Sequence, residues 1–308
     1  YDVYGIGNAL VDTEYEVDDT FLSYTKLPKG IMTLIEEDDR QRLIHMLEEE
    51  HEYKVIKQAG GGSAANTMVI ISQLGGSAFY SCKVANDATG DFFVKDLKAA
   101  GIDTNLSDER ETGATGQCIS MVTPDAERTM TTCLGITNFL SPGELNPDAL
   151  RASTKLYIEG YLVSSFTGIE AVLEAQAIAK SAGVDISLTL SDPAMVENFK
   201  PNYHRILDQG VDLLLCNHDE ARLLTGADSV EDCARHLKKI CPTFVITCGK
   251  DGSLGFDGKD ISRIDGVPTH AVDTTGAGDI FSGAFLYSLC QGKNFAEAAE
   301  LANRSASL

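Results

Sequence analysis

The second half of the chain alternates between short apolar segments and helical segments, and this alternation restricts the possible folds more than any other feature. Four apolar segments have the length and composition of buried strands: residues 155–158, 184–189, 213–216 and 244–247. The segments between them carry apolar residues at helical spacing. Strands that alternate with helices are typical of a parallel sheet flanked by helices. The sequence therefore predicts an α/β fold with a central, mostly parallel sheet.

Two other regions do not follow this alternation. Residues 13–17 and 30–35 alternate apolar and polar side chains, and so do residues 117–122 and 128–134, which flank a turn at Pro124. Such a period of two predicts half-exposed strands. We therefore expect a small β-sheet lid formed by residues 13–35 and 113–134, over an α/β core formed by residues 1–12, 36–112 and 135–308.

The charge of the chain argues against two classes of partner. Its 308 residues include 25 Lys and Arg against 46 Asp and Glu, a formal net charge of -21. Nucleic acids and anionic membranes bind clusters of cations, and the sequence has no apolar stretch near the ~20 residues of a membrane span. We therefore expect no nucleic acid and no membrane as partner. The eight cysteines form no CxxC pair, which favours free thiols in a cytoplasmic protein.

The most informative motif is Asp-Thr-Thr-Gly-Ala-Gly-Asp, which begins at Asp273 and ends at Asp279. Apolar side chains recur at helical spacing after it, so a helix should begin near Ala277. Free amides at a helix N-terminus, without side chains to obstruct them, attract an anion. An anion site with a carboxylate at its edge is what phosphoryl transfer to a hydroxyl requires. Favourable pairing with the helix dipole is a simpler role for Asp279.

At this point the sequence resembles a known family, the ribokinase-like (PfkB) sugar and nucleoside kinases. Residues 273–286 resemble the family's C-terminal signature, and residues 60–67 resemble its N-terminal signature. Between them, residues 217–220 are similar to an Asn-x-x-Glu motif, and residues 245–249 are similar to a nucleotide-binding strand. The resemblance implies a ribokinase-like fold and a kinase that uses ATP and Mg²⁺ to phosphorylate a small-molecule alcohol.

The resemblance also implies roles around the transferred phosphate. Asp279 would be the general base that activates a primary alcohol, and the anion hole for the γ-phosphate would consist of Gly276, Ala277 and Gly278. Arg128, near a predicted lid turn, would either neutralise charge on the moving phosphate or pair with a neighbouring acid such as Glu127, and both alternatives stay open. Some relatives bind a monovalent cation near the position of Asp273.

Six positions are expected at the nucleotide by the same resemblance: Asn217, Glu220, Thr247, Gly249, Gly252 and Asn303. Glu220 would act on Mg²⁺ through water, because this ion keeps much of its hydration and prefers oxygen ligands. Two simpler explanations stay open. Asn217 would also serve as the cap of the helix that follows it, and Asn303 would also fit as an ordinary polar residue on a helix surface.

The acceptor site is expected where the first strand ends. Asn8 and Asp12 follow that strand, and a carboxylate together with an amide can bind the neighbouring hydroxyls of a sugar. Gly62 would allow the main chain to approach a sugar ring, and Asn66, one helical turn later, would face the same hydroxyls. A solvated position on a lid strand is the simpler explanation of Asp12.

Several residues bear on the identity of the acceptor. Met32 on a lid strand and Tyr161 would form an apolar slot for a nucleobase, or would simply pack the lid on the core. The spacing of residues 7–12 is more similar to adenosine kinase and inosine/guanosine kinase than to ribokinase, although Leu162 stands where adenosine kinases carry a second aromatic residue. We expect a nucleoside such as adenosine; a free sugar (ribose or fructose), inosine or guanosine are the alternatives. A catalytically silent nucleoside sensor is the non-enzyme alternative, and both a monomer and a homodimer are open.

Overall fold

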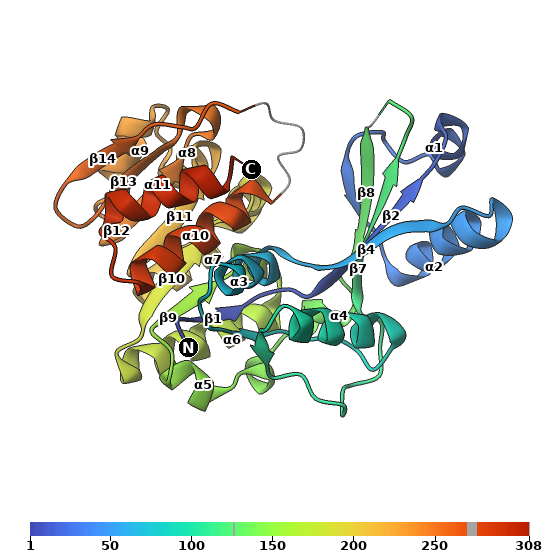
Figure 1. The fold of residues 1–308 in the computed structure, drawn as a ribbon, viewed down its shortest axis with the longest axis horizontal. Coiled ribbons are helices and arrows are strands. Elements are labelled where there is room, and N and C mark those ends of the chain that lie inside the picture. Colours follow the sequence, from blue (N-terminus) through green and yellow to red (C-terminus); the bar gives the residue numbers. More distant parts are fainter. Residues whose placement is uncertain (126, 270–275, 308) are drawn as a thin grey trace.

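The computed structural model describes residues 1–125, 127–269 and 276–307 (Figure 1). Within these residues the larger sheet has nine strands, in the order β14-β13-β12-β11-β10-β9-β1-β5-β6. All neighbours from β12 to β6 are parallel, and β13 and β14 extend one edge in antiparallel fashion. This sheet confirms the predicted α/β fold. Its strands are β1 (Val3–Ile6), β5 (Ala78–Ser81), β6 (Asp103–Thr104), β9 (Lys155–Ile158), β10 (Asp185–Thr189), β11 (Leu213–Asn217), β12 (Thr243–Thr247), β13 (Ser253–Phe256) and β14 (Ile261–Ile264).

Helices cover both faces of the larger sheet. One face packs against α5 (Pro147–Arg151), α6 (Phe166–Ala182), α7 (Pro193–Asp208), α8 (His218–Thr225) and α9 (Val230–Leu237). The other face packs against α3 (Ser63–Gln73), α4 (Ala88–Ala99), α10 (Ala277–Cys290) and α11 (Phe295–Ser305). Val3 and Tyr4, adjacent on β1, are buried in these two different layers, which explains why the strands are continuous apolar runs. None of the helices formed by the described residues is both long and apolar enough to cross a membrane.

A second sheet of five strands stands away from the larger one (Figure 1) and has the order β3-β8-β7-β2-β4. We call it the small sheet; its strands are β2 (Leu10–Glu16), β3 (Met32–Leu34), β4 (Val55–Gly61), β7 (Gly116–Val122) and β8 (Arg128–Cys133). One face is covered by α1 (Asp19–Thr25), α2 (Glu37–His45) and the π-helical turn Met46–Glu50, which share a buried apolar cluster with the strands. The opposite face is therefore the one available to a ligand.

Two segments that we expected in the core belong to the small sheet. Strand β4 pairs with β2, and α2 packs against the same sheet. The prediction was wrong for β4 because its apolar residues do not alternate: Val55 and Ile56 are adjacent and both are exposed. Strand β2 also begins earlier than expected, at Leu10. Asp12 therefore lies on the small sheet and not in the core.

The chain passes between the core and the small sheet through two connecting segments that lie side by side, and we call them the crossings. Residues 7–9 lead from β1 to β2, and Gly62 leads from β4 to α3. The φ angle of Gly62 is 103°, and a Cβ atom at this position would lie 2.3 Å from the main-chain oxygen of Asn8. A residue without a side chain is therefore required at Gly62. The two crossings are packed main chain against main chain.

Candidate active site

A cavity of about 590 Å³ lies between the open face of the small sheet and the carboxyl ends of the parallel strands. Ligands of open α/β sheets bind at this edge of the sheet. The small sheet provides one wall through all five of its strands. The opposite wall includes one residue at or just after the end of each of β1, β9, β10, β11 and β12, namely Asn8, Glu159, Thr189, Asn217 and Thr247.

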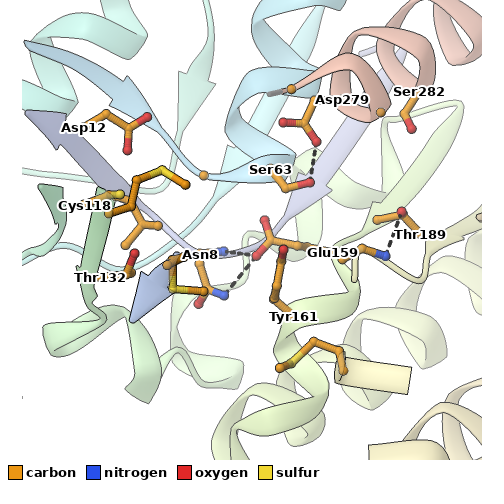
Figure 2. Close-up of a pocket in the computed structure, with 18 of the residues that line it drawn as sticks. Asn8, Asp12, Ser63, Cys118, Thr132, Glu159, Tyr161, Thr189, Asp279 and Ser282 are labelled. Carbon is orange, nitrogen blue, oxygen red and sulfur yellow. Dashed lines mark hydrogen bonds between the residues drawn. The ribbon is translucent and has the colours of Figure 1, made fainter. Parts of the chain in front are cut away.

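Asp279 lies in the first turn of α10 and points toward α3 in this cavity (Figure 2). Its Oδ1 accepts a hydrogen bond from Ser63 Oγ at 2.6 Å, and its Oδ2 accepts one from Asn66 Nδ2 at 3.0 Å. Burial raises the pKa of Asp279 to about 6, although the two hydrogen bonds act in the opposite direction. The carboxylate is thus oriented by α3, partly buried and ionised at neutral pH, as a general base must be.

The start of α10 has space for an anion beside Asp279. Gly276 is the N-cap with a φ angle of 78°, and a Cβ atom at Gly278 would meet nothing within 4 Å. The first amides of a helix lack partners within the helix. Both glycines line the cavity, whereas Ala277 is not among the lining residues, so any part it plays falls to its main-chain amide. Residues 273–275, and with them the predicted cation site near Asp273, lie outside the described residues.

The predicted acceptor residues are brought together in this cavity. Asn8, Asp12, Met32, Gly62 and Tyr161 all line it. The sixth, Asn66, is the hydrogen-bond donor to Asp279 rather than a lining residue. Burial raises the pKa of Asp12, and the charge of Lys57 lowers it. The structure therefore places a carboxylate on the small-sheet wall and another, Asp279, on the core wall.

Glu159 is a site residue that the sequence analysis missed. It directly follows β9, is 1% exposed and lines the cavity. Its Oε1 accepts hydrogen bonds from Asn8 N at 3.2 Å and Asn8 Nδ2 at 2.9 Å, as Figure 2 shows, and its Oε2 accepts one from Ala64 N at 2.8 Å. Burial raises the pKa of Glu159 to about 7 against the lowering effect of these bonds. An acidic residue immediately after an apolar parallel strand was the available signal.

Three predicted nucleotide residues line the same cavity: Asn217, Glu220 and Thr247. Asn217 caps α8, since its Oδ1 accepts a hydrogen bond from Glu220 N at 2.8 Å, and Glu220 Oε2 accepts one from Asn217 N at 2.8 Å. The simpler capping role is therefore present in the structure. Burial raises the pKa of Glu220 to about 7. This side chain both binds Asn217 at the start of α8 and presents a carboxyl group to the cavity.

The donor set suits hydrated Mg²⁺ better than a directly bound metal ion. No group of three or more His, Cys, Asp or Glu in the part of the chain that the structure describes could hold a metal. Each carboxylate oxygen of Glu220 already accepts one hydrogen bond from Asn217 and keeps a further lone pair for a water molecule. Because Mg²⁺ retains several waters and binds phosphates, Asn217 and Glu220 fit a contact with it through water.

A second hollow of about 540 Å³ adjoins the ends of β11 and β12; its lining residues are His218, Val230, Cys248, Lys250, Asp251, Arg263, Asp265 and Gly266. The remaining three nucleotide candidates flank this hollow. Gly249 lies between two lining residues, a Cβ atom at Gly252 would lie 2.4 Å from Gly266 N, and Asn303 Nδ2 donates to Asp265 O at 3.3 Å. Asn303 is buried, so it is not the surface residue of the simpler explanation.

Arg128 lies on β8 and lines the main cavity. Its Nη2 atom is 3.2 Å from Glu14 Oε2 on β2, and its side chain is 43% exposed. The arginine is therefore held within the small sheet, on the wall opposite α10.

The fold and this site are those of a phosphotransferase with an alcohol group as acceptor: a partly buried carboxylate lies beside a glycine-rich helix N-terminus at the ligand-binding edge of an α/β sheet. The sequence matches the family model described as pfkB family carbohydrate kinase over residues 31–308. The chain therefore belongs to the PfkB family of carbohydrate kinases, as the sequence motifs predicted. Kinases of this family use ATP.

Individual relatives include both sugar kinases and nucleoside kinases. The ribokinase of Staphylococcus aureus (strain COL) is 29% identical over 266 residues, which are 84% of each chain. The adenosine kinase of Saccharomyces cerevisiae is 24% identical over 306 residues, 94% of this chain and 88% of that one. Among solved structures, adenosine kinase from Sinorhizobium meliloti has a TM-score of 0.87 and 33% identity, covering 99% of this chain and 92% of that chain. A probable sugar kinase from Rhizobium etli CFN 42 also has a TM-score of 0.87, with 31% identity, covering 100% and 92%.

Proposed function

We propose that this protein transfers the γ-phosphate of ATP to the primary hydroxyl of a ribose-containing nucleoside, with adenosine as the preferred acceptor. The observation that carries the proposal is the partly buried Asp279 carboxylate, held by Ser63 and Asn66 and open to the cavity. Asn8 and Asp12 line the same cavity and would bind the two neighbouring ribose hydroxyls. The primary hydroxyl would then lie near Asp279.

Each group of the site has a part in the transfer. Bound ATP would supply the phosphoryl group and leave as ADP, and Mg²⁺ held through water by Asn217 and Glu220 would offset the negative charge of the phosphates. Asp279 accepts the proton of the attacking hydroxyl, while Ser63 and Asn66 keep its carboxylate in one orientation. The amides at Gly276, Ala277 and Gly278 stabilise charge on the transferred group.

A nucleobase is favoured over an uncharged sugar alone by the apolar part of the cavity. The small-sheet wall presents a set of apolar or sulfur-bearing side chains, namely Leu10, Met32, Leu34, Cys118, Met130 and Leu134, and Tyr161 lines the core wall. Met32 and Leu34 remain 47% and 59% exposed, and a planar base would remove such surface from water. A free sugar offers little apolar surface for this wall.

A free sugar is the second candidate acceptor, and a polar feature of the site favours it. Glu159 and Asn8 form a hydrogen-bonded polar pair in the cavity. Leu162 is buried, so a single aromatic side chain, Tyr161, would stack on a base from this element. The similarity to ribokinase is also consistent with a sugar acceptor.

A panel of acceptors decides between these candidates. With ATP and Mg²⁺, we expect kcat/KM for adenosine to exceed that for ribose by at least ~10-fold, because the apolar wall contributes only when a base is present. A coupled assay of ADP formation, run with adenosine, inosine, guanosine, ribose and fructose, measures this ratio. Equal or higher kcat/KM with ribose would contradict the nucleoside proposal, and no acceptor-dependent ADP formation would favour the silent sensor.

A further inference from the structure

We propose that Glu159 is a positioning residue that ties two chain crossings to the core and so sets the small sheet against the acceptor. It acts through Asn8 and Ala64, without contact to the reacting atoms. The inference rests on the kinase activity proposed above but not on which acceptor is used.

One carboxylate holds both crossings. Oε1 accepts hydrogen bonds from the main chain and the side chain of Asn8, within the crossing from β1 to β2. Oε2 accepts a hydrogen bond from Ala64 N, two residues after the crossing at Gly62. The main-chain nitrogen of Glu159 also donates to Ile6 O, at the end of β1. Glu159 therefore links the larger sheet to the points where the chain enters β2 and leaves β4.

The packing around the carboxylate leaves little freedom for a shift. A Cβ atom at Gly7 would lie 2.5 Å from Glu159 Oε2, and Tyr80 Oη donates to Asn8 O at 2.7 Å. Beyond the crossings, Leu10 of β2 pairs with Gly61 of β4. A movement of either crossing is therefore transmitted directly to two neighbouring strands of the small sheet.

Glu159 and the catalytic base share the first turn of α3. Ala64 N binds Glu159, while Ser63 and Asn66, on either side of Ala64 in the chain, bind Asp279. A first turn that loses its contact with Glu159 would also hold Asp279 less firmly. The effect of Glu159 should therefore reach both the acceptor wall and the orientation of the base.

The three bonds to Glu159 all come from N–H donors, an arrangement that fits an ionised carboxylate. Protonation replaces one acceptor with a donor and weakens the tie. The pKa of about 7 places this change near neutral pH, since burial opposes ionisation. The other titratable groups that interact with this carboxyl are Asp279, Tyr80, Tyr157, Tyr161, Tyr203 and Cys82.

The first test is the kinetics of Glu159→Gln with any acceptor that the panel identifies. The amide keeps the shape of the side chain, but its nitrogen would face an N–H donor, so one crossing loses its acceptor. We expect Glu159→Gln to lower kcat/KM above pH 7 by about 10- to 100-fold. In the unsubstituted protein kcat/KM should decrease as the pH is lowered through about 7, where Glu159 gains a proton, and again through about 6, where Asp279 does. The variant should lose the first decrease and keep the second. Glu144→Gln is the matched control, because the Glu144 side chain is also largely buried but pairs with Lys83 at 2.8 Å and does not line the cavity.

Acceptors that lack one hydroxyl separate positioning from direct binding. A positioning residue lowers kcat/KM by a similar factor for each of these acceptors. If Glu159 instead bound one hydroxyl, removing that hydroxyl would cancel the effect of Glu159→Gln, and the proposal would be overturned. Unchanged kcat/KM and pH profile in the folded variant would overturn it too.

Hydrogen exchange tests the hydrogen bonds from Asn8 and Ala64 to Glu159 without any acceptor, and it can be measured first in the unsubstituted protein. Protection of the Asn8 and Ala64 amides, corrected for the intrinsic effect of pH, should fall as the pH is lowered from 8 to 6. In Glu159→Gln the protection of at least one of these amides should be low at both pH values. Constant protection in both proteins would contradict the proposal, whatever the acceptor assays show. Failure of the panel alone would contradict the proposed function and leave this measurement valid.

Discussion

Replacing Asp279 by Asn is expected to lower kcat by about 1,000-fold, because an amide cannot accept the proton of the attacking hydroxyl. The amide keeps the size of the side chain and an oxygen that can bind Ser63 or Asn66, so the turn at the start of α10 should persist. Nucleotide affinity should change by no more than about threefold. Steady-state kinetics and a titration with a non-hydrolysable ATP analogue measure the two quantities separately.

The pH dependence provides an independent check on this assignment. The base must be ionised, and the pKa of Asp279 is about 6, so kcat/KM should fall as the pH is lowered through about 6. This fall should be absent from the residual activity of Asp279→Asn. Asp91→Asn is the matched control, since Asp91 also lies in the first turn of a helix but is paired with Arg110 and does not line the cavity. Near-normal kcat in Asp279→Asn would show that another group is the base.

Gly62→Ala is expected to have the largest effect on stability. The new methyl group would lie 2.3 Å from Asn8 O, and the φ angle of 103° is unfavourable for any residue with a side chain. Strain and collision together should lower the free energy of unfolding by about 3 kcal/mol or more. Because the collision involves the crossing that carries Asn8, the folded fraction should also bind the acceptor more weakly. Urea unfolding and the acceptor KM measure these effects.

Gly75→Ala isolates the contribution of the collision. Gly75 has a similar φ angle, 93°, but a Cβ atom there would have no neighbour within 4 Å. This control should lower the free energy of unfolding by only about 1–2 kcal/mol and leave the acceptor KM unchanged. Equal losses of stability in the two variants would mean that the contact between the two crossings contributes little.

The larger sheet could be predicted because its strands are buried on both faces. Residues 155–158 were predicted with the bounds that β9 has in the structure, and the predicted helix start at Ala277 is where α10 begins. Such strands are recognised by their own apolar residues, and the start of α10 is marked by Gly276 before it and by the helical spacing of the apolar residues after it. Local sequence therefore contained the information needed for these elements.

The small sheet and Glu159 depend on contacts that local sequence does not contain. Strand β4 is mostly exposed and lacks alternation, so its place is set by pairing with β2 rather than by burial. The apolar strand that precedes Glu159 marks its place at the edge of the sheet but not what it binds, because its partners Asn8 and Ala64 are 151 and 95 residues away in the sequence. The candidate site was predicted where a motif lies on one element and was incomplete where a side chain joins several elements.

Four carboxyl groups with raised pKa values, Asp12, Asp279, Glu159 and Glu220, border one cavity. Each binds its proton more tightly in the folded chain than in the unfolded chain, so folding takes up protons between roughly pH 4 and 7. The contribution of these groups to stability is complete below that window and is lost as the pH rises through it. In the ligand-free enzyme these groups therefore contribute least to stability at the pH where Asp279 is ionised and can act as a base.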